Sequence, residues 1–324
     1  MMTAMNLLDT AIPIENLALW AMPAWIRPAW VAVAAGLVAL AALAALGGLL
    51  RAVTPKMAAV AWTTAKEALS QPLFYVLLFI GAVYMALACF MPYNTLGEDI
   101  KLVKDGGLTV IMVLSTILAV WTASVSVAEE IEGRIAVTVL SKPIGRREFI
   151  FGKFLGILAP VVFLFVVLGT LFLASVSYKV VYDARETASP EPTAADCQKE
   201  IVQVLPGLPL AFMVVVVLSS IALAISTRLP MVPNLVICAA VYALGHLLPT
   251  LVREAAQGPA IPYFMAQLLA TVLPVLDNFN MYTAISAGKE VPLELLGWAG
   301  VYCAIYTTVA LLGALLLFED RDLA

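Results

Sequence analysis

Long apolar runs separated by short charged segments dominate the sequence. Seven of these runs have the length of about 20 residues that an α-helix needs to cross a bilayer. The predicted spans are residues 28–50, 72–91, 106–128, 151–176, 207–227, 231–248 and 293–318. A further apolar stretch, 261–276, is short and contains Pro262 and Pro274, so we interpret it as interfacial or re-entrant.

The composition places the chain among membrane proteins. Of its 324 residues, 63% are hydrophobic and 12% are charged, whereas soluble domains have about 45–50% apolar and about 25% charged residues. The formal net charge of −4 differs from the basic footprint of proteins that bind nucleic acids. We therefore predict an all-α polytopic membrane protein whose partners include the lipid membrane and no nucleic acid.

The distribution of lysine and arginine predicts the orientation. Loops 51–71, 129–150 and 228–230, together with the C-terminus and Lys153, are richer in basic residues than the longer loops of the opposite side. The positive-inside rule makes this richer set cytoplasmic. Seven spans then put the N-terminus outside and the C-terminus inside. Lys153, at the start of the fourth span, is expected to snorkel to the cytoplasmic surface.

The N-terminal region 1–50 is predicted to be an outer segment followed by an uncleaved transmembrane anchor. Asp9 and Glu15 precede the first basic residue, Arg27, which is unlike the basic start of a signal peptide.

Residues 54–71 follow this anchor, and Met57, Val60, Ala61, Thr64 and Ala68 fall on one helical face. This spacing predicts either a helix in the inner membrane interface or a cytoplasmic linker helix.

The loop 129–150 combines basic residues with an apolar stripe. Ile131, Ile135 and Val139 recur every four residues, which is the spacing of one helix face. Pro143 ends this helix and favours the start of a second one, which leads through residues 144–153 into the fourth span. A cytoplasmic helix with an apolar face has to bury that face. The pattern alone leaves two readings: a docking element, or a solvated loop that only sets topology.

The same segment resembles the loop after the second core span of ABC-2 type transporter permeases. Their pattern is an acidic pair, a glycine, aliphatic residues, Ser/Thr-x-Pro, Arg-x-Glu and Gly-Lys. The chain matches it at Glu130, Glu132, Gly133, Leu140, Ser141, Pro143, Arg146, Glu148, Gly152 and Lys153. Residues 64–79 and 273–292 resemble two further family segments, so the resemblance covers residues 54–320. Within the family, the chain is most similar to permeases involved in multicopper-enzyme maturation.

The resemblance implies a six-span body at 51–324, with an interfacial elbow helix at 54–71 and a cytoplasmic coupling loop at 129–150. The extra span within 1–50 departs from the six-span family plan. The implied partners are a separate ABC ATPase subunit and a second permease copy, in the bacterial inner membrane. The residues expected to couple to the ATPase are Glu129, Glu130, Glu132, Gly133, Arg134, Ile135, Val139, Leu140, Pro143, Arg146, Glu148, Gly152 and Lys153.

The sequence lacks the motifs of two enzyme classes. It contains no G-x4-G-K-[S/T] phosphate loop, so ATP and Mg²⁺ are expected on the partner subunit. Glu129, Glu130 and Arg134 match the EExxxR motif of CAAX-type intramembrane metalloproteases, but His246 is the only histidine. A catalytic metal normally has three protein ligands. We expect no catalytic, metal or cofactor site in this chain.

Several readings stay open at this point. The chain is either a transporting permease or a non-transporting scaffold or force-transmitting subunit driven by the same type of ATPase. A transported substrate could be lipid-linked, a polysaccharide, a drug, a peptide or copper-enzyme-related cargo. The outer loop 179–203 is expected to be a solvated cap, and Gly152-x3-Gly156 to allow close helix contact.

Overall fold

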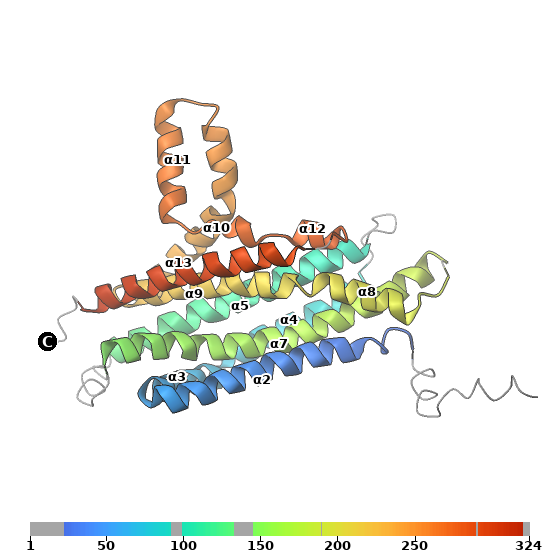
Figure 1. The fold of residues 1–324 in the computed structure, drawn as a ribbon, viewed down its shortest axis with the longest axis horizontal. Coiled ribbons are helices and arrows are strands. Elements are labelled where there is room, and N and C mark those ends of the chain that lie inside the picture. Colours follow the sequence, from blue (N-terminus) through green and yellow to red (C-terminus); the bar gives the residue numbers. More distant parts are fainter. Residues whose placement is uncertain (1–22, 92–98, 133–144, 189, 290, 320–324) are drawn as a thin grey trace, which may run out of the picture.

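The computed structural model describes residues 23–91, 99–132, 145–188, 190–289 and 291–319. These residues form a bundle of helices, and no strand occurs among them (Figure 1). The elements are α2 (Ala29–Val53), α3 (Pro55–Ser70), α4 (Pro72–Ala88), α5 (Asp99–Glu132), α7 (Arg146–Glu186), α8 (Ala194–Val204), α9 (Gly207–Ser226), α10 (Met231–Ala255), α11 (Ala260–Val272), the 3-10 turn η1 (Leu276–Phe279), α12 (Tyr282–Ser286) and α13 (Leu293–Glu319).

The lengths of the apolar helices confirm an all-α polytopic membrane protein. Within the described residues, six segments are long and apolar enough to cross a bilayer, and up to eight if each of two bent helix pairs is one span. In the first pair, α3 and α4 meet at 62°. In the second, α11 and the following segment meet at 56°. The predicted number of spans, seven, lies between the six and eight that the helices allow.

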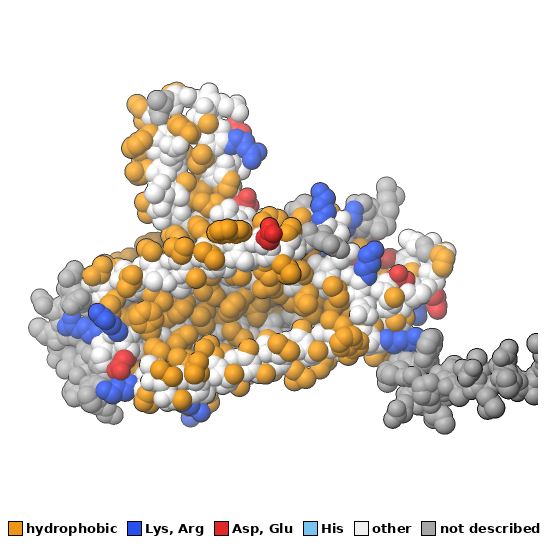
Figure 2. Space-filling view, viewed as in Figure 1, with side chains coloured by type: hydrophobic (Ala, Val, Ile, Leu, Met, Phe, Trp, Pro, Cys, Tyr) orange, Lys and Arg blue, Asp and Glu red, His pale blue; other side chains and the backbone are white. Residues whose placement is uncertain are grey.

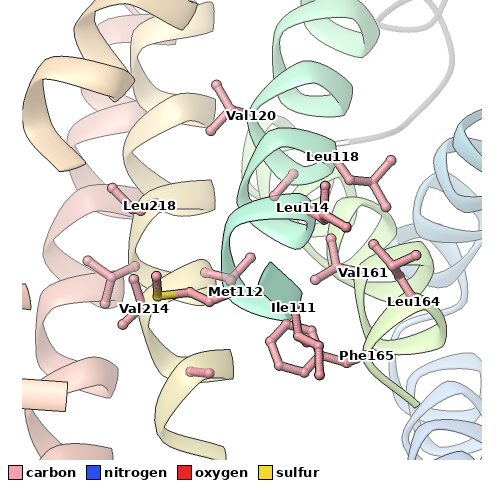
Figure 3. Close-up of a cluster of buried hydrophobic side chains, with 14 of the residues drawn as sticks. Ile111, Met112, Leu114, Leu118, Val120, Val161, Leu164, Phe165, Val214 and Leu218 are labelled. Carbon is pink, nitrogen blue, oxygen red and sulfur yellow. The ribbon is translucent and has the colours of Figure 1, made fainter. Parts of the chain in front are cut away.

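Helix α5 occupies the centre of the bundle. Its side chains pack on one side against α7 and on the other against α9 (Figure 3). Leu118 of α5 and Val161 and Leu164 of α7 are completely buried, and Met112 of α5 packs near Val214 of α9. By contrast, large apolar side chains on the outside, such as Trp298 of α13, are exposed. This is the distribution expected when lipid rather than water covers the bundle.

The loops predicted to share one side of the membrane lie at the same end of the bundle. The start of α7, the C-terminal ends of α2 and α13 and the turn after α9 gather there, whereas α8 lies at the opposite end (Figure 1). We call the first the basic end, because it carries Arg51, Lys56, Arg146, Arg147 and Arg228. A broad apolar surface separates the two charged ends (Figure 2).

Helices α10 and α11 form a hairpin that projects from the side of the bundle (Figure 1). The chain then returns through a break at residues 273–275, in the stretch predicted to be re-entrant. Two tyrosines of α13 satisfy backbone groups at this break. The Val275 N–H donates to Tyr302 Oη over 3.0 Å, and the Tyr306 hydroxyl donates to the Val272 carbonyl over 3.0 Å. Such partners are needed because unpaired backbone groups are costly in lipid.

This pairing predicts the effect of removing one hydroxyl. Tyr302→Phe leaves the Val275 N–H without its acceptor, so the protein should lose about 1–2 kcal/mol of stability. Thermal unfolding of the detergent-purified protein measures this loss. Tyr263→Phe is the matched control, because the Tyr263 hydroxyl accepts only an exposed hydrogen bond from Gln267 among the described contacts. Equal melting temperatures for both variants and the unmodified protein would contradict the assigned role.

Candidate functional site

The predicted coupling loop leaves and re-enters the bundle at the basic end. Helix α5 ends at Glu132, so Glu129, Glu130 and Glu132 lie in its last turn. The loop positions outside the described residues are Gly133, Arg134, Ile135, Val139, Leu140 and Pro143. Helix α7 begins at Arg146, which agrees with the predicted second helix that leads from the loop into the fourth span.

Glu148 stabilises the start of α7. The backbone N–H of Gly145 donates to Glu148 Oε2 over 2.9 Å. A glutamate at the third helical position that reaches back in this way is one half of a capping box. Its carboxylate also lies near the positive end of the helix dipole. The glutamate of the Arg-x-Glu motif therefore has a structural role, whereas Arg146 and Arg147 are exposed at the surface.

Lys153 lies inside the bundle. Its side chain is 1% exposed, and its Nζ donates to the backbone carbonyl of Ser126 in α5 over 3.1 Å. The ammonium also lies 5.9 Å from the ring centre of Phe149, one turn earlier in α7. The expectation that Lys153 snorkels to the surface is wrong. Its charge is held by a carbonyl and an aromatic face, and it joins the helix that enters the loop to the helix that leaves it.

Phe149 connects the same turn of α7 to the last span. Its ring stacks on Phe318 near the end of α13, with 5.5 Å between ring centres and 22° between ring planes. Phe149 and Phe318 are 4% and 1% exposed. An offset stack of two buried rings contributes packing beyond its apolar area. The end of α13 is thereby fixed to the base of the loop.

Gly152 and Gly156 bring α7 into close contact with α3. A Cβ atom at Gly152 would lie 2.8 Å from Val60 Cβ, and one at Gly156 would lie 2.7 Å from the Ala61 carbonyl oxygen. No larger residue fits without moving α3. The predicted close contact at Gly152-x3-Gly156 is confirmed, and its partner is the helix predicted at 54–71. Val60, Thr64 and Ala68 of the predicted apolar face are buried.

These contacts divide the expected coupling residues into two groups. Arg146 and Glu148 lie at the surface or close to it, whereas Gly152 and Lys153 lie within the bundle, where they hold the loop base. The base is thus connected to α3, α5 and α13 by separate contacts. A displacement of the loop would reach all three helices, because close-packed helices transmit displacement rather than absorb it.

The opposite end holds a charged cluster that the sequence did not predict. Lys104 of α5 pairs with Glu200 of α8, and its Nζ lies 3.4 Å from Gln203 Oε1. Lys179 of α7 pairs with Asp183 over 2.9 Å and with Asp99 of α5 over 3.7 Å.

Residues 179–203 therefore do not form a simple solvated cap. Helix α7 continues to Glu186, and α8 buries Cys197, Ile201 and Val204. The carboxylates of Asp99, Asp183 and Glu186 lie within 4.8 Å of one another. The ammonium of Lys179 already compensates two of them, so this arrangement is a salt-bridge network that joins α5 and α7. The separate pair of Lys104 with Glu200 joins α5 to α8.

The histidine and the cysteines have local contacts. His246 Nδ1 lies 3.0 Å from the carbonyl oxygen of Tyr242, one turn earlier in α10. Cys89, Cys197, Cys238 and Cys303 are all buried and unbridged, as expected for cysteines that act as small hydrophobic residues.

Comparison with known proteins gives no family for this chain. No protein-family model matches it, and no curated protein matches it either.

The glycine contacts predict opposite effects for two small substitutions. Gly156→Ala forces α3 away from α7 and should destabilise the protein by about 1–3 kcal/mol. Gly313→Ala, on α13, meets no atom within 4 Å. It should be neutral or stabilise by up to about 1 kcal/mol, because alanine favours a helix more than glycine does. Thermal unfolding in detergent tests both, and a Gly156→Ala protein as stable as Gly313→Ala would refute the close contact.

Proposed function

We propose that the chain is the membrane-spanning permease subunit of an ABC-2 type transporter. In this proposal, a separate ABC ATPase subunit hydrolyses ATP, and the permease moves an unidentified substrate across a cell membrane. The resemblance of residues 129–153 to the family's coupling loop supports the assignment. The cytoplasmic side of the membrane is then the side of the basic end.

One observation carries the proposal: the segment with the family motif begins and ends on helices that are joined to each other. Lys153 of α7 bonds to Ser126 of α5 immediately below the loop. A loop that only connected two spans would not need a buried ammonium at its base, since burying a charge is costly unless it is compensated. A loop that receives force from a partner does need a stiff base. The contacts to α3 and α13 extend that base across the bundle.

The motifs in the sequence assign different roles to the permease and the ATPase subunit. Because the sequence has no phosphate-binding loop, the nucleotide and Mg²⁺ are assigned to the ATPase. A second permease copy completes the transporter in this proposal. The cell-membrane location is implied by the resemblance to the family. The proposed orientation, with the N-terminus outside and the C-terminus inside, combines the distribution of basic residues with the seven predicted spans.

A force-transmitting subunit without transport is the alternative function. The contact that favours it is the ion pair between Lys104 of α5 and Glu200 of α8. Through this pair, a movement of α5 at the basic end would reach α8 at the outer end, where a second protein could be acted upon. The two functions share the ATPase and differ in whether a substrate crosses the membrane.

Docking of the loop on an ATPase predicts the effect of a charge in the apolar stripe. Val139→Asp and Leu140→Asp place a carboxylate where we expect a buried contact, and an unpaired buried charge is far more costly than a lost methyl group. Both variants should insert normally and lose the ATPase that co-purifies with the unmodified chain.

The control is Lys142→Ala, since a single charge at the rim of a contact contributes little. The solvated-loop reading predicts equal recovery of the ATPase with all three variants. Intact complexes with both aspartate variants would therefore remove the coupling role.

The missing phosphate loop predicts the activity of the purified subunit. The chain alone should bind and hydrolyse no ATP above the background of an empty-membrane preparation, and hydrolysis should appear when the co-purifying ATPase is added. A phosphate-release assay in detergent measures both. Sustained turnover by the chain without any second polypeptide would contradict the proposal.

A further inference from the structure

Helices α2 and α7 pack closely at Gly36 and enclose a wedge towards the basic end. An added Cβ at Gly36 would lie 2.9 Å from Thr170 Cγ2. The buried residues of α2 are Ala32 and Gly36, both in its first half. Towards the basic end α7 packs against α3 instead, through Gly152 and Gly156. The second half of α2 is therefore separated from α7 by the wedge.

The wedge contains a cavity of about 800 Å³. Its walls are the second half of α2, one face of α3 and residues 155–163 of α7, with Phe212 of α9 at its side. A smaller cavity of about 280 Å³ continues from it along α2 and shares Ala39, Val162 and Phe212. The space-filling view shows a hollowed apolar surface along this side of the bundle (Figure 2).

The lining favours an apolar occupant. The space opens to the surface of the bundle, because Leu46 of α2 and Trp62 of α3 in its lining are exposed. Ordered water needs several polar partners, which a lining of mainly alanine and leucine does not offer. Gly47 and Gly48 of α2 line the cavity, and a Cβ at either would meet no atom within 4 Å. An acyl chain fits such a space.

The end of the wedge at the basic end is positively charged. Arg51, in the last turn of α2, lines the cavity together with Trp62 of α3. Its guanidinium carbon lies 5.1 Å from the centre of the Trp62 ring. Stacking on an aromatic ring orients a guanidinium group, whose N–H groups form strong paired hydrogen bonds with phosphate. Basic pockets between transmembrane helices bind acidic lipid headgroups in this way.

We propose that the wedge is a binding site for an anionic phospholipid. One acyl chain fills the cavity between α2, α3 and α7, and the phosphate headgroup binds Arg51. The acyl chain of such a lipid contacts the apolar lining, and its phosphate group pairs with the guanidinium group of Arg51. The lipid then forms part of the contact between α2 and the rest of the bundle. The site is formed by residues outside the predicted coupling loop, so its test does not depend on whether an ATPase binds that loop.

Native mass spectrometry tests the site directly. The protein is reconstituted into bilayers of equal amounts of phosphatidylglycerol and phosphatidylcholine, released in mild detergent, and its retained lipids are counted. The unmodified protein should retain phosphatidylglycerol in preference to phosphatidylcholine. Arg51→Gln should reduce this preference roughly tenfold, since one charge-assisted bond is lost. Gly48→Leu adds a side chain to the cavity lining and should reduce retention of both lipids.

Two matched variants serve as controls. Arg253→Gln removes a basic residue of the projecting hairpin, and Gly313→Leu adds the same side chain at an open position of α13. Both should retain lipid like the unmodified protein.

Equal retention by all variants would overturn the proposal, and so would equal retention of the two lipids by the unmodified protein. A photoreactive group on the acyl chain of phosphatidylglycerol provides the second readout. It should label peptides from α2, α3 or α7. Labelling confined to other helices would equally refute the site.

Discussion

The packing of α7 at the basic end is the constraint on which the rest of the structure depends. At Gly152 and Gly156 the backbone of α7 lies against α3, and one turn of the same helix places Lys153 against the end of α5. These contacts tolerate little change, because the first is between backbones and the second holds a charge away from water. They set the positions of α3, of the central helix α5, and of the points at which α5 ends and α7 begins.

The sequence predicted the features that depend on local pattern. The apolar runs predicted the membrane helices, and the spacing of Val60, Thr64 and Ala68 predicted the buried face of α3. Runs and periodicity are properties of consecutive residues, so they can be read without knowing the fold. The pair of Gly152 and Gly156 was also recognisable in the sequence, but the sequence did not identify α3 as the helix that it contacts. The ends of the spans were predicted less well, since α7 continues to Glu186, beyond the predicted end of the fourth span at residue 176.

The sequence did not predict contacts between distant residues. Lys153 looked like an interfacial lysine because it begins an apolar run, but the Ser126 carbonyl of α5 holds it inside the bundle. The ion pair between Lys104 and Glu200 joins residues on separate helices, and no pattern of consecutive residues indicates it. Asn234 is similar: it lies in an apolar run and donates to Ser124 and to the Ala222 carbonyl across the core. A buried charge or amide is explained by its tertiary partners.

The N-terminal helix has a different relation to the bundle. Helix α2 is the span predicted within residues 1–50, and it packs closely against α7 at Gly36. The rest of its inner face borders an apolar cavity that ends at Arg51. Helix α7 therefore packs tightly against α3 on one face and borders the apolar cavity beside α2 on a neighbouring face. In the proposed account, force passes through the first and lipid occupies the second.

An ATPase-coupled function depends most directly on which protein the loop between α5 and α7 contacts in the cell. The most direct measurement replaces Leu140 with a photo-cross-linking amino acid and identifies the product formed in intact membranes. The account predicts a covalent product with a second protein that contains a G-x4-G-K-[S/T] phosphate loop. Cross-linking to lipid alone, or no product with any protein, would contradict an ATPase-coupled function.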